Sequence, residues 1–225
     1  MIKKWIVVLT AVLLAAVTMF GVSRKSMYTN ITADLSQCYV GVLAEDNAVS
    51  TASKMRTTLA SSPIIIRATA SEGLDPVFGM NQQLVRVEEV YKGEGLVPGD
   101  SIYVTSFRWY FMMPRAYGIE ETIIETGCVN IMEVGTEYLL FLDGRIDTKN
   151  PNDTVPIYLL TGDFQYLLSP VFSYEEHENV VAQPKGSLWV VPYKDVAQNE
   201  FFAATDRGME ALVKLKHDLI ERYPR

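Results

Sequence analysis

Carboxylates beside a histidine are the first residues in this sequence whose types could support metal binding or hydrolysis. The run Glu175–Glu178, which includes His177, offers consecutive side chains that could hold a divalent cation. Consecutive side chains point in different directions, whereas a cation site needs convergent oxygen ligands at defined distances. We therefore interpret this run as a solvated acidic turn.

A second group of carboxylates, Glu120, Glu121 and Glu125, has the residue types of a hydrolytic pair. Glycoside hydrolysis needs two carboxyl groups at a defined separation, and the spacing in the sequence does not fix that separation. Alternating glutamates on the exposed face of a strand are also ordinary. Glu120 and Glu125 are therefore candidates only for the alternative that the protein is a hydrolase.

The two cysteines, Cys38 and Cys128, allow two interpretations. In an exported domain they could form one disulfide that closes a long loop and constrains the unfolded chain. Alternatively, both are buried thiols that pack as small hydrophobic residues. Cys128 and His177 also have the residue types of a nucleophile and its base, but the sequence around Cys128 matches no nucleophile motif. His177 and His217 are the only histidines and no CxxC occurs, so no metal site is predicted.

Motifs of the familiar enzyme classes are absent from the sequence. It contains no GxSxG, HExxH, Walker or dinucleotide-binding glycine pattern, so a common hydrolase, zinc protease or nucleotide enzyme lacks its usual signature. We predict that the protein is not an enzyme and uses no cofactor. An extracytoplasmic hydrolase with an unrecognised active site is the alternative, with Glu120, Glu125 or Cys128 as its candidate residues.

The segment from Phe107 to Tyr117 is the strongest candidate for a binding surface, because it places five aromatic residues and two methionines beside two arginines. Aromatic and arginine side chains dominate interface hot spots, and methionine adapts to irregular partners. The predicted binding residues, for a protein or glycan partner, are Arg108, Trp109, Tyr110, Phe111, Arg115 and Tyr117. The alternative is a strand extension that places Phe107, Trp109 and Phe111 in the hydrophobic core.

The first 25 residues predict a helix that targets the membrane. Every residue from Trp5 to Val22 is apolar, Gly or Thr, and the flanks carry four lysines or arginines and no acidic residue. Such a helix reaches about 27 Å, close to the roughly 30 Å of a hydrocarbon core. An uncleaved anchor is favoured over a cleaved signal peptide, whose apolar stretch is usually about 7–15 residues long. We predict a single-pass membrane protein with its C-terminal domain outside the cytoplasm, or a secreted protein if the segment is cleaved.

Charge restricts the partners of the remaining chain. The net charge is −7, and without the four cationic residues of the leader it is −11, since −7 − 4 = −11. Nucleic acids need a basic surface, so they are not predicted partners. Positive charges flank the apolar segment on both sides, so the positive-inside rule does not decide its orientation. A reversed anchor with a cytosolic domain is the less favoured alternative.

The chain after the leader is long enough for one hydrophobic core, and 48% of all residues are hydrophobic. We predict a mainly β fold with flanking helices: a stem and first strand at 26–50 and one β-rich domain at 51–225. Alternating or β-branched runs predict strands at 38–43, 64–70, 84–91, 101–105, 121–129, 137–142, 157–160 and 187–191. Helices are predicted at 50–59 and, from an apolar stripe, at about 205–223. Lys216 falls inside that stripe, and we expect its ammonium group to extend to solvent.

Three glycine-bounded motifs between Pro63 and Leu142 carry a resemblance to a known family. They are Val85-x-Val87-x-x-Val90-x-Lys92-Gly93, Pro98-Gly99-Asp100-x-Ile102-x-Val104 and Val134-Gly135-Thr136-x-Tyr138-Leu139-Leu140-Phe141-Leu142. The chain resembles bacterial exported domains that are similar to the tissue-inhibitor-of-metalloproteinase and netrin modules. This resemblance covers about a third of the chain and implies a five-stranded, OB-like antiparallel Greek-key barrel over about 63–142. The animal inhibitors chelate the protease zinc through a free N-terminal cysteine, whereas Cys38 lies well beyond the leader, so metalloprotease inhibition is not expected.

Overall fold

The computed structural model describes residues 13–14, 17–19, 21, 35–77, 80–112, 122–148, 154–162, 165–184 and 188–225. The chain divides into two compact units, Met1–Leu35 and Ser36–Arg225. Described residues of the first unit before Leu35 are helical, and their large apolar side chains are 62–72% exposed. Among the described residues, no helix is both long enough and apolar enough to cross a membrane. Most of the predicted leader at 1–25 lies outside the described residues.

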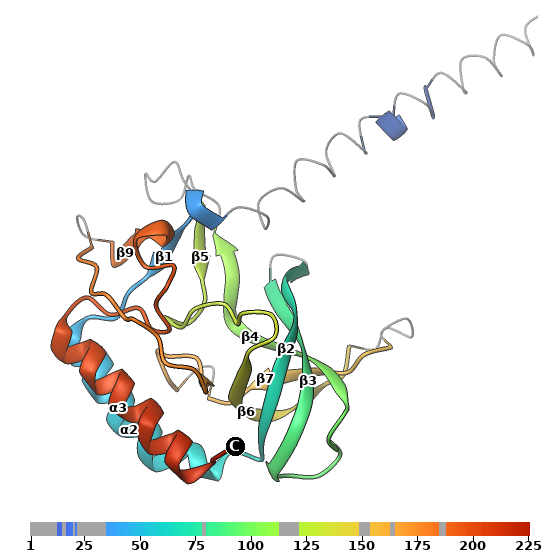
Figure 1. The fold of residues 1–225 in the computed structure, drawn as a ribbon. Coiled ribbons are helices and arrows are strands. Elements are labelled where there is room, and N and C mark those ends of the chain that lie inside the picture. Colours follow the sequence, from blue (N-terminus) through green and yellow to red (C-terminus); the bar gives the residue numbers. More distant parts are fainter. Residues whose placement is uncertain are drawn as a thin grey trace, which may run out of the picture. The chain divides into compact units, whose positions relative to one another are not determined.

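The unit Ser36–Arg225 is mainly β and carries two α-helices and short 3-10 helices (Figure 1). Its described strands are β1 (Tyr39–Gly41), β2 (Ile64–Val77), β3 (Met80–Lys92), β4 (Ser101–Met112), β5 (Ile123–Glu125), β6 (Glu137–Ile146), β7 (Ile157–Leu160), β8 (Val171–Ser173) and β9 (Val190–Pro192). Its helices are η1 (Leu35–Gln37), α2 (Glu45–Thr58), η2 (Leu59–Ser61), η4 (Tyr193–Asp195) and α3 (Asp206–Arg222). The mainly β class with a C-terminal helix, predicted from the sequence, is therefore confirmed.

The extents of the predicted elements differ from the structure in a consistent way. The long central strands β2, β3, β4 and β6 extend beyond the predicted ranges, whereas β1, β5 and β9 are only three residues long. The helix predicted at 50–59 begins earlier, at Glu45. Strand β8 was not predicted, because all three of its residues are buried and a short run without alternation gives no period-2 pattern.

Strands β2, β3 and β4 follow one another as antiparallel neighbours. The predicted turn between β3 and β4 begins at Gly93, whose φ is +107°. A Cβ atom at this position would lie 2.8 Å from Ile64 Cγ1 and 2.9 Å from the Pro63 carbonyl oxygen. Glycine is therefore required here for two reasons: the positive φ, and the close approach of this turn to the start of β2.

Strands β6 and β7 connect the two outer strands of this three-stranded meander, β2 and β4. Strand β6 returns to pair antiparallel with β2, and β7 pairs antiparallel with β6 and parallel with β4. The order β6-β2-β3-β4 is the Greek-key order, in which the fourth strand lies beside the first. The five pairings among β2, β3, β4, β6 and β7 thus form a ring.

The sheet as a whole does not form a closed barrel. Beyond β4 it continues through β5 and β1 to β9, while β8 pairs with β6 outside this path. Two pairings, β4 with β7 and β1 with β5, are parallel. The prediction of an antiparallel barrel is therefore wrong in two respects: the barrel is not closed, and two strand pairings are parallel. Each parallel pairing includes a strand outside 63–142, β7 in one and β1 in the other.

Helices α2 and α3 lie side by side in this unit (Figure 1). The two helices approach closely at Gly208, where the absence of a side chain leaves room for Ala48. A Cβ atom at Gly208 would lie only 3.2 Å from Ala48 Cβ. Helix α3 begins after Thr205, whose hydroxyl accepts a hydrogen bond from the Gly208 N–H at 3.2 Å and so caps the helix. Of the apolar stripe predicted from the sequence, Met209, Leu212 and Leu219 are buried against the core, and Leu215, outside the predicted stripe, is buried as well.

Lys216 does not extend to solvent, so that expectation is wrong. Its side chain is 4% exposed, and its Nζ atom lies 2.7 Å from Oε2 of Glu200, which is 3% exposed. Nζ also donates to the Glu175 carbonyl oxygen, and Oε1 of Glu200 accepts from the Ser173 N–H at 2.7 Å. The stripe tolerates a lysine because a buried carboxylate and a carbonyl group take the place of water.

Removal of one partner of this pair should destabilise the fold. Lys216→Met leaves the Glu200 carboxylate buried without its cation, and we expect a loss of about 3–5 kcal/mol in the free energy of unfolding. The matched control is the double variant Lys216→Met/Glu200→Gln, which buries neither charge and should lose less. Denaturant unfolding at about pH 8 measures both, and a double variant as unstable as Lys216→Met would contradict this account.

The same pair makes stability depend on pH. Burial raises the pKa of Glu200 from 4.5 to about 7, although Lys216 and the Ser173 N–H oppose this effect. The folded chain then binds this proton more tightly than the unfolded chain, so the stabilisation is complete below about pH 4.5 and is lost as the pH rises through about 7. We expect the unfolding free energy of the wild type to fall between about pH 5 and about pH 8, relative to the double variant. Parallel pH profiles would contradict the raised pKa.

Candidate functional site

The pairing of β3 with β4 is interrupted by a bulge in β4. Gln82 pairs with Thr105 and Met80 with Tyr110, so a step of two residues on β3 faces a step of five on β4. Bulges bend a strand, redirect its side chains and are common beside functional sites. The residues between the two paired positions, 106–109, belong to the segment that the sequence predicts as a binding surface.

The bulge sends neighbouring side chains in different directions. Phe107 is 48% exposed, whereas Trp109 is 4% exposed. The Arg108 N–H donates to the Ser106 hydroxyl at 3.1 Å, a local bond that supports the bulged backbone. Phe107 is therefore displayed on the surface, although the core alternative placed it inside. Trp109, a predicted binding residue, is in the core.

Trp109 fixes the bulge from the inside. Its Nε1–H donates to the Thr126 carbonyl oxygen at 2.8 Å and to the Ser169 hydroxyl at 3.0 Å. The Ser169 hydroxyl in turn donates to the same carbonyl oxygen at 3.0 Å. Gly127 allows this arrangement, because its φ is +66° and a Cβ atom there would lie 2.1 Å from Ser169 Oγ. A buried indole with its N–H satisfied holds β4 to the segment that follows β5.

A small cavity with a mixed polar and apolar lining lies beside the Trp109 ring. Its volume is about 10 Å³, and it is lined by Leu74, Asn81, Gln83, Trp109, Glu125, Thr126, Asn130 and Ile131. Asn81 is 1% exposed, and neither atom of its side-chain amide has a hydrogen-bond partner among the described residues. Gln83, by contrast, donates to the Met132 carbonyl oxygen at 3.0 Å and accepts from its N–H at 2.9 Å.

The electrostatics of this region favour protonated groups. Burial raises the pKa of Glu125, and the positive charge of Arg108 opposes the increase. Burial also raises the pKa of the Cys128 thiol to about 12, supported by Glu125 and opposed by Arg108. Because the thiolate is the reactive form, Cys128 is a poor nucleophile at neutral pH. His177 interacts instead with Lys216 and the backbone of Gln198, and burial and Lys216 lower its pKa.

The structure leaves the side chains of most other predicted site residues outside its described part. Tyr110 and Phe111 belong to β4, where they pair with Glu125 and Ile124, but their side chains lie outside the described part of the structure. Outside the described residues altogether are Arg115, Tyr117, Glu120 and Glu121. Cys38 and Cys128 are thiols in this structure, and the disulfide between them stays a prediction.

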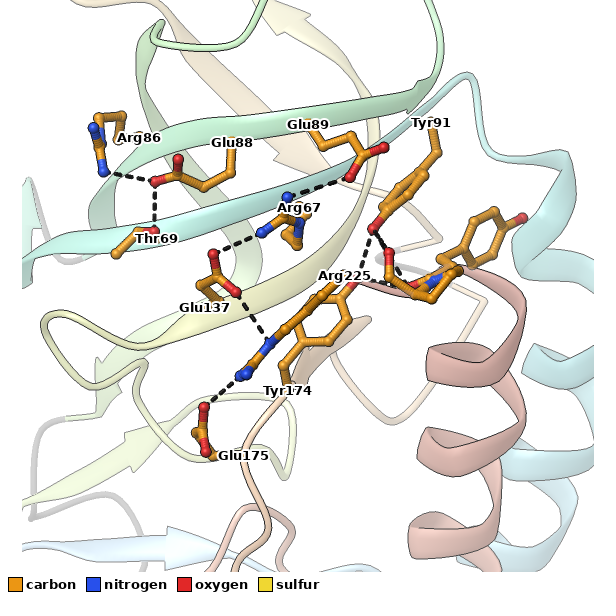
Figure 2. Close-up of polar contacts among 12 residues, drawn as sticks. Arg67, Thr69, Arg86, Glu88, Glu89, Tyr91, Glu137, Tyr174, Glu175 and Arg225 are labelled. Carbon is orange, nitrogen blue, oxygen red and sulfur yellow. Dashed lines mark hydrogen bonds and ion pairs between the residues drawn. The ribbon is translucent and has the colours of Figure 1, made fainter.

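A second polar cluster joins β2, β3 and β6 to the C-terminal residues (Figure 2). Arg67 lies between two carboxylates, with Nη1 2.7 Å from Glu137 Oε1 and Nη2 3.3 Å from Glu89 Oε2. Arg225 Nε lies 3.1 Å from the other oxygen of Glu137, and its Nη2 contacts Glu175. Glu137 therefore bridges two guanidinium groups. Because these charges are already paired with each other, we interpret the cluster as a structural ion network.

An open depression of about 480 Å³ lies over this cluster. Its polar lining includes Thr69, Arg86 and Glu88, which are themselves connected: the Thr69 hydroxyl donates to Glu88 at 2.6 Å, and Arg86 lies 2.9 Å from the same carboxylate oxygen (Figure 2). Open, solvated ion pairs of this type contribute little to stability or to affinity. The bulge of β4 is therefore the stronger candidate site.

Two residues of the candidate site were not found by sequence reasoning. Asn81 and Gln83 are 1% and 0% exposed, yet they occur in the polar run Met80-Asn81-Gln82-Gln83. Three consecutive amides at the start of an apolar strand are a signal that was available. Polar residues on a strand are usually assigned to the solvent side, and only the bulge in β4 shows that these amides face the interior.

No model of a known protein family matches this chain, and no curated protein matches its sequence.

The two orientations at the bulge predict different effects on stability. We expect Trp109→Ala to cost about 3–5 kcal/mol, because it removes a buried ring, the donor to the Ser169 hydroxyl and one of the two donors to the Thr126 carbonyl oxygen. Phe107→Ala, two residues away in the same strand, should change stability by about 0.5 kcal/mol or less. Denaturant unfolding of the full chain measures both variants. Equal losses in the two variants would contradict this division of the strand.

Proposed function

We propose that the protein is a membrane-anchored interaction module whose extracytoplasmic domain binds a protein or glycan partner through the bulged face of β4. The observation that carries this proposal is the bulge itself, which exposes Phe107 and leaves its neighbour Arg108 half-buried, while Trp109 anchors the strand from within. An aromatic ring and a guanidinium group on a rigid support are the side chains that dominate interface hot spots. A rigid support also lowers the entropy cost of binding.

The strand order supports an OB-like core for this domain. A ring of five pairings with Greek-key order is what an OB-type fold requires, and β3 and β4 are its second and third strands. In OB-folds the face formed by the second and third strands binds oligosaccharides or oligonucleotides. The net charge of −11 after the leader (−7 − 4) disfavours an oligonucleotide, which leaves a glycan or a protein. The kinship with exported domains of the tissue-inhibitor and netrin type is part of this proposal.

The proposed location rests on the sequence of the leader. Its apolar run between Trp5 and Val22, with positive flanks, fits a single-pass anchor. In this arrangement the domain faces the outside of the cell, where surface partners are accessible. Cleavage of the leader would give the same domain as a secreted protein.

An enzymatic role has less support from the site. The Cys128 thiol is protonated at neutral pH because of its raised pKa. Within the described ranges, no group of three or more His, Cys, Asp or Glu residues could hold a metal ion. Glu125 has a raised pKa and lines a cavity, but a volume of about 10 Å³ does not admit a substrate. Binding at the surface of the bulge is thus the better-supported function.

Cross-linking from the bulge tests the proposal. A photoreactive amino acid is placed at position 107 of the full-length protein, which is expressed in its own cells. After irradiation, we expect one discrete cross-linked product, either with a protein or with a glycan. The matched control is the same substitution at Val134, an exposed apolar residue (61% exposed) outside the candidate site. Phe107→Ala and Arg108→Ala should then weaken binding of the identified partner by about tenfold or more, which corresponds to about 1.4 kcal/mol each.

Three outcomes would contradict the proposal. Cross-links of equal yield from positions 107 and 134 would indicate non-specific contact. A complete absence of products would favour an anchored spacer domain. Turnover of peptide or glycan substrates that disappears in Glu125→Gln would establish the hydrolase alternative.

A further inference from the structure

The side-chain amide of Asn81 is buried without a protein partner. The residue is 1% exposed, and both Nδ2 and Oδ1 are unsatisfied within the described part of the chain. A buried amide without hydrogen bonds costs roughly 1–3 kcal/mol, so native proteins almost always provide a partner. Its main chain is well fixed, because the Thr105 hydroxyl donates to the Asn81 carbonyl oxygen at 2.7 Å. The backbone that carries this amide is therefore fixed beside the cavity.

The neighbouring amides do not supply the missing partner. The Asn130 amide nitrogen donates to the carbonyl oxygens of Ala197 and Asn199 at 2.8 and 2.7 Å. Its Oδ1 accepts from the Ile131 N–H at 2.8 Å and from the Tyr193 hydroxyl at 3.0 Å. All hydrogen-bonding positions of Asn130 that face the cavity wall are thus in use. Gln83 is likewise bonded at both ends to the Met132 backbone.

The size and chemistry of the cavity define what it can hold. A volume of about 10 Å³ corresponds to one water molecule. The Asn81 amide presents one donor group and one acceptor group, so a metal cation would serve only the oxygen and an anion only the nitrogen. The Glu125 carboxyl on the same wall disfavours an anion as well. A neutral molecule that both donates and accepts is required, and it must be as small as water.

We infer that the cavity beside Trp109 is a binding site for a single ordered water molecule, which bonds the Asn81 amide and links it to the wall that carries Glu125. The water fills the space under the bulge between β3 and β5. It is a structural part of the support for β4, since an empty polar cavity would leave the amide unsatisfied. This inference does not depend on the proposed partner binding, because it concerns only the interior of the domain.

A crystal structure of the full chain at high resolution tests the site directly. We expect one spherical density peak within about 2.7–3.2 Å of Asn81 Nδ2 or Oδ1, with a second polar contact on the cavity wall. Either of two results would overturn the inference: a cavity without density, or an Asn81 amide bonded directly to protein groups. Density with the short, regular coordination distances of a metal ion would also overturn it.

Substitution of Asn81 gives an independent test, because a hydrated and a dry cavity predict opposite changes in Tm. Asn81→Leu keeps the approximate shape and removes both polar groups, so in a hydrated cavity it breaks the water bonds and should lower Tm by about 2–4 °C or more. In a dry cavity the same change removes an unsatisfied amide and leaves Tm unchanged or raises it, which would refute the water site. Asn199→Leu is the matched control, because Asn199 is 0% exposed and its amide is fully bonded to protein groups, so its loss must lower Tm.

Discussion

A charge that is removed from water must be paired, and the pair of Glu200 and Lys216 determines how the helices meet the sheet. Glu200 bonds α3 through Lys216 and β8 through the Ser173 N–H. Its backbone N–H donates to Asn179 Oδ1 at 2.9 Å, and its carbonyl oxygen accepts from the Asn130 N–H at 2.8 Å. One residue thereby connects a helix, a strand and two loops. The position of helix α2 depends on the same ion pair, because α2 packs on α3.

The bulge of β4 is the place where the interior of this domain determines its surface. The inner side chain, Trp109, is bonded to Thr126 and Ser169, and the polar cavity lies beside its ring. The outer side chain, Phe107, is 48% exposed. A binding residue on such a support does not need to be ordered when a partner arrives. Under the proposed function, the same strand serves stability on one side and recognition on the other.

The sequence predicts the elements of this fold better than it predicts the direction of individual side chains. The alternating and β-branched runs of β2, β3, β4 and β6 are long enough to be recognised, and an apolar stripe indicates α3. Lys216 was assigned to solvent because only the tertiary structure brings Glu200, sixteen positions away, beside it. The bulge depends on the register between β3 and β4, which a period-2 pattern does not contain. Arg108 was predicted as a binding residue from residue types alone, whereas the burial of Asn81 appears only in the folded chain.

The pairing ring has a kinetic consequence for this chain. Strand β2 can form a local hairpin with β3, but its other edge, at Ile64–Ile66, pairs with Leu140–Leu142, about 76 positions later. Strand β1 pairs with β9, about 150 positions later. Contacts this distant in sequence form slowly, because the entropy of loop closure is lost before the contacts stabilise the chain. A nascent domain therefore exposes the apolar edge of β2 until β6 is available, and in this interval it is vulnerable to aggregation and depends on the protection of its cellular environment.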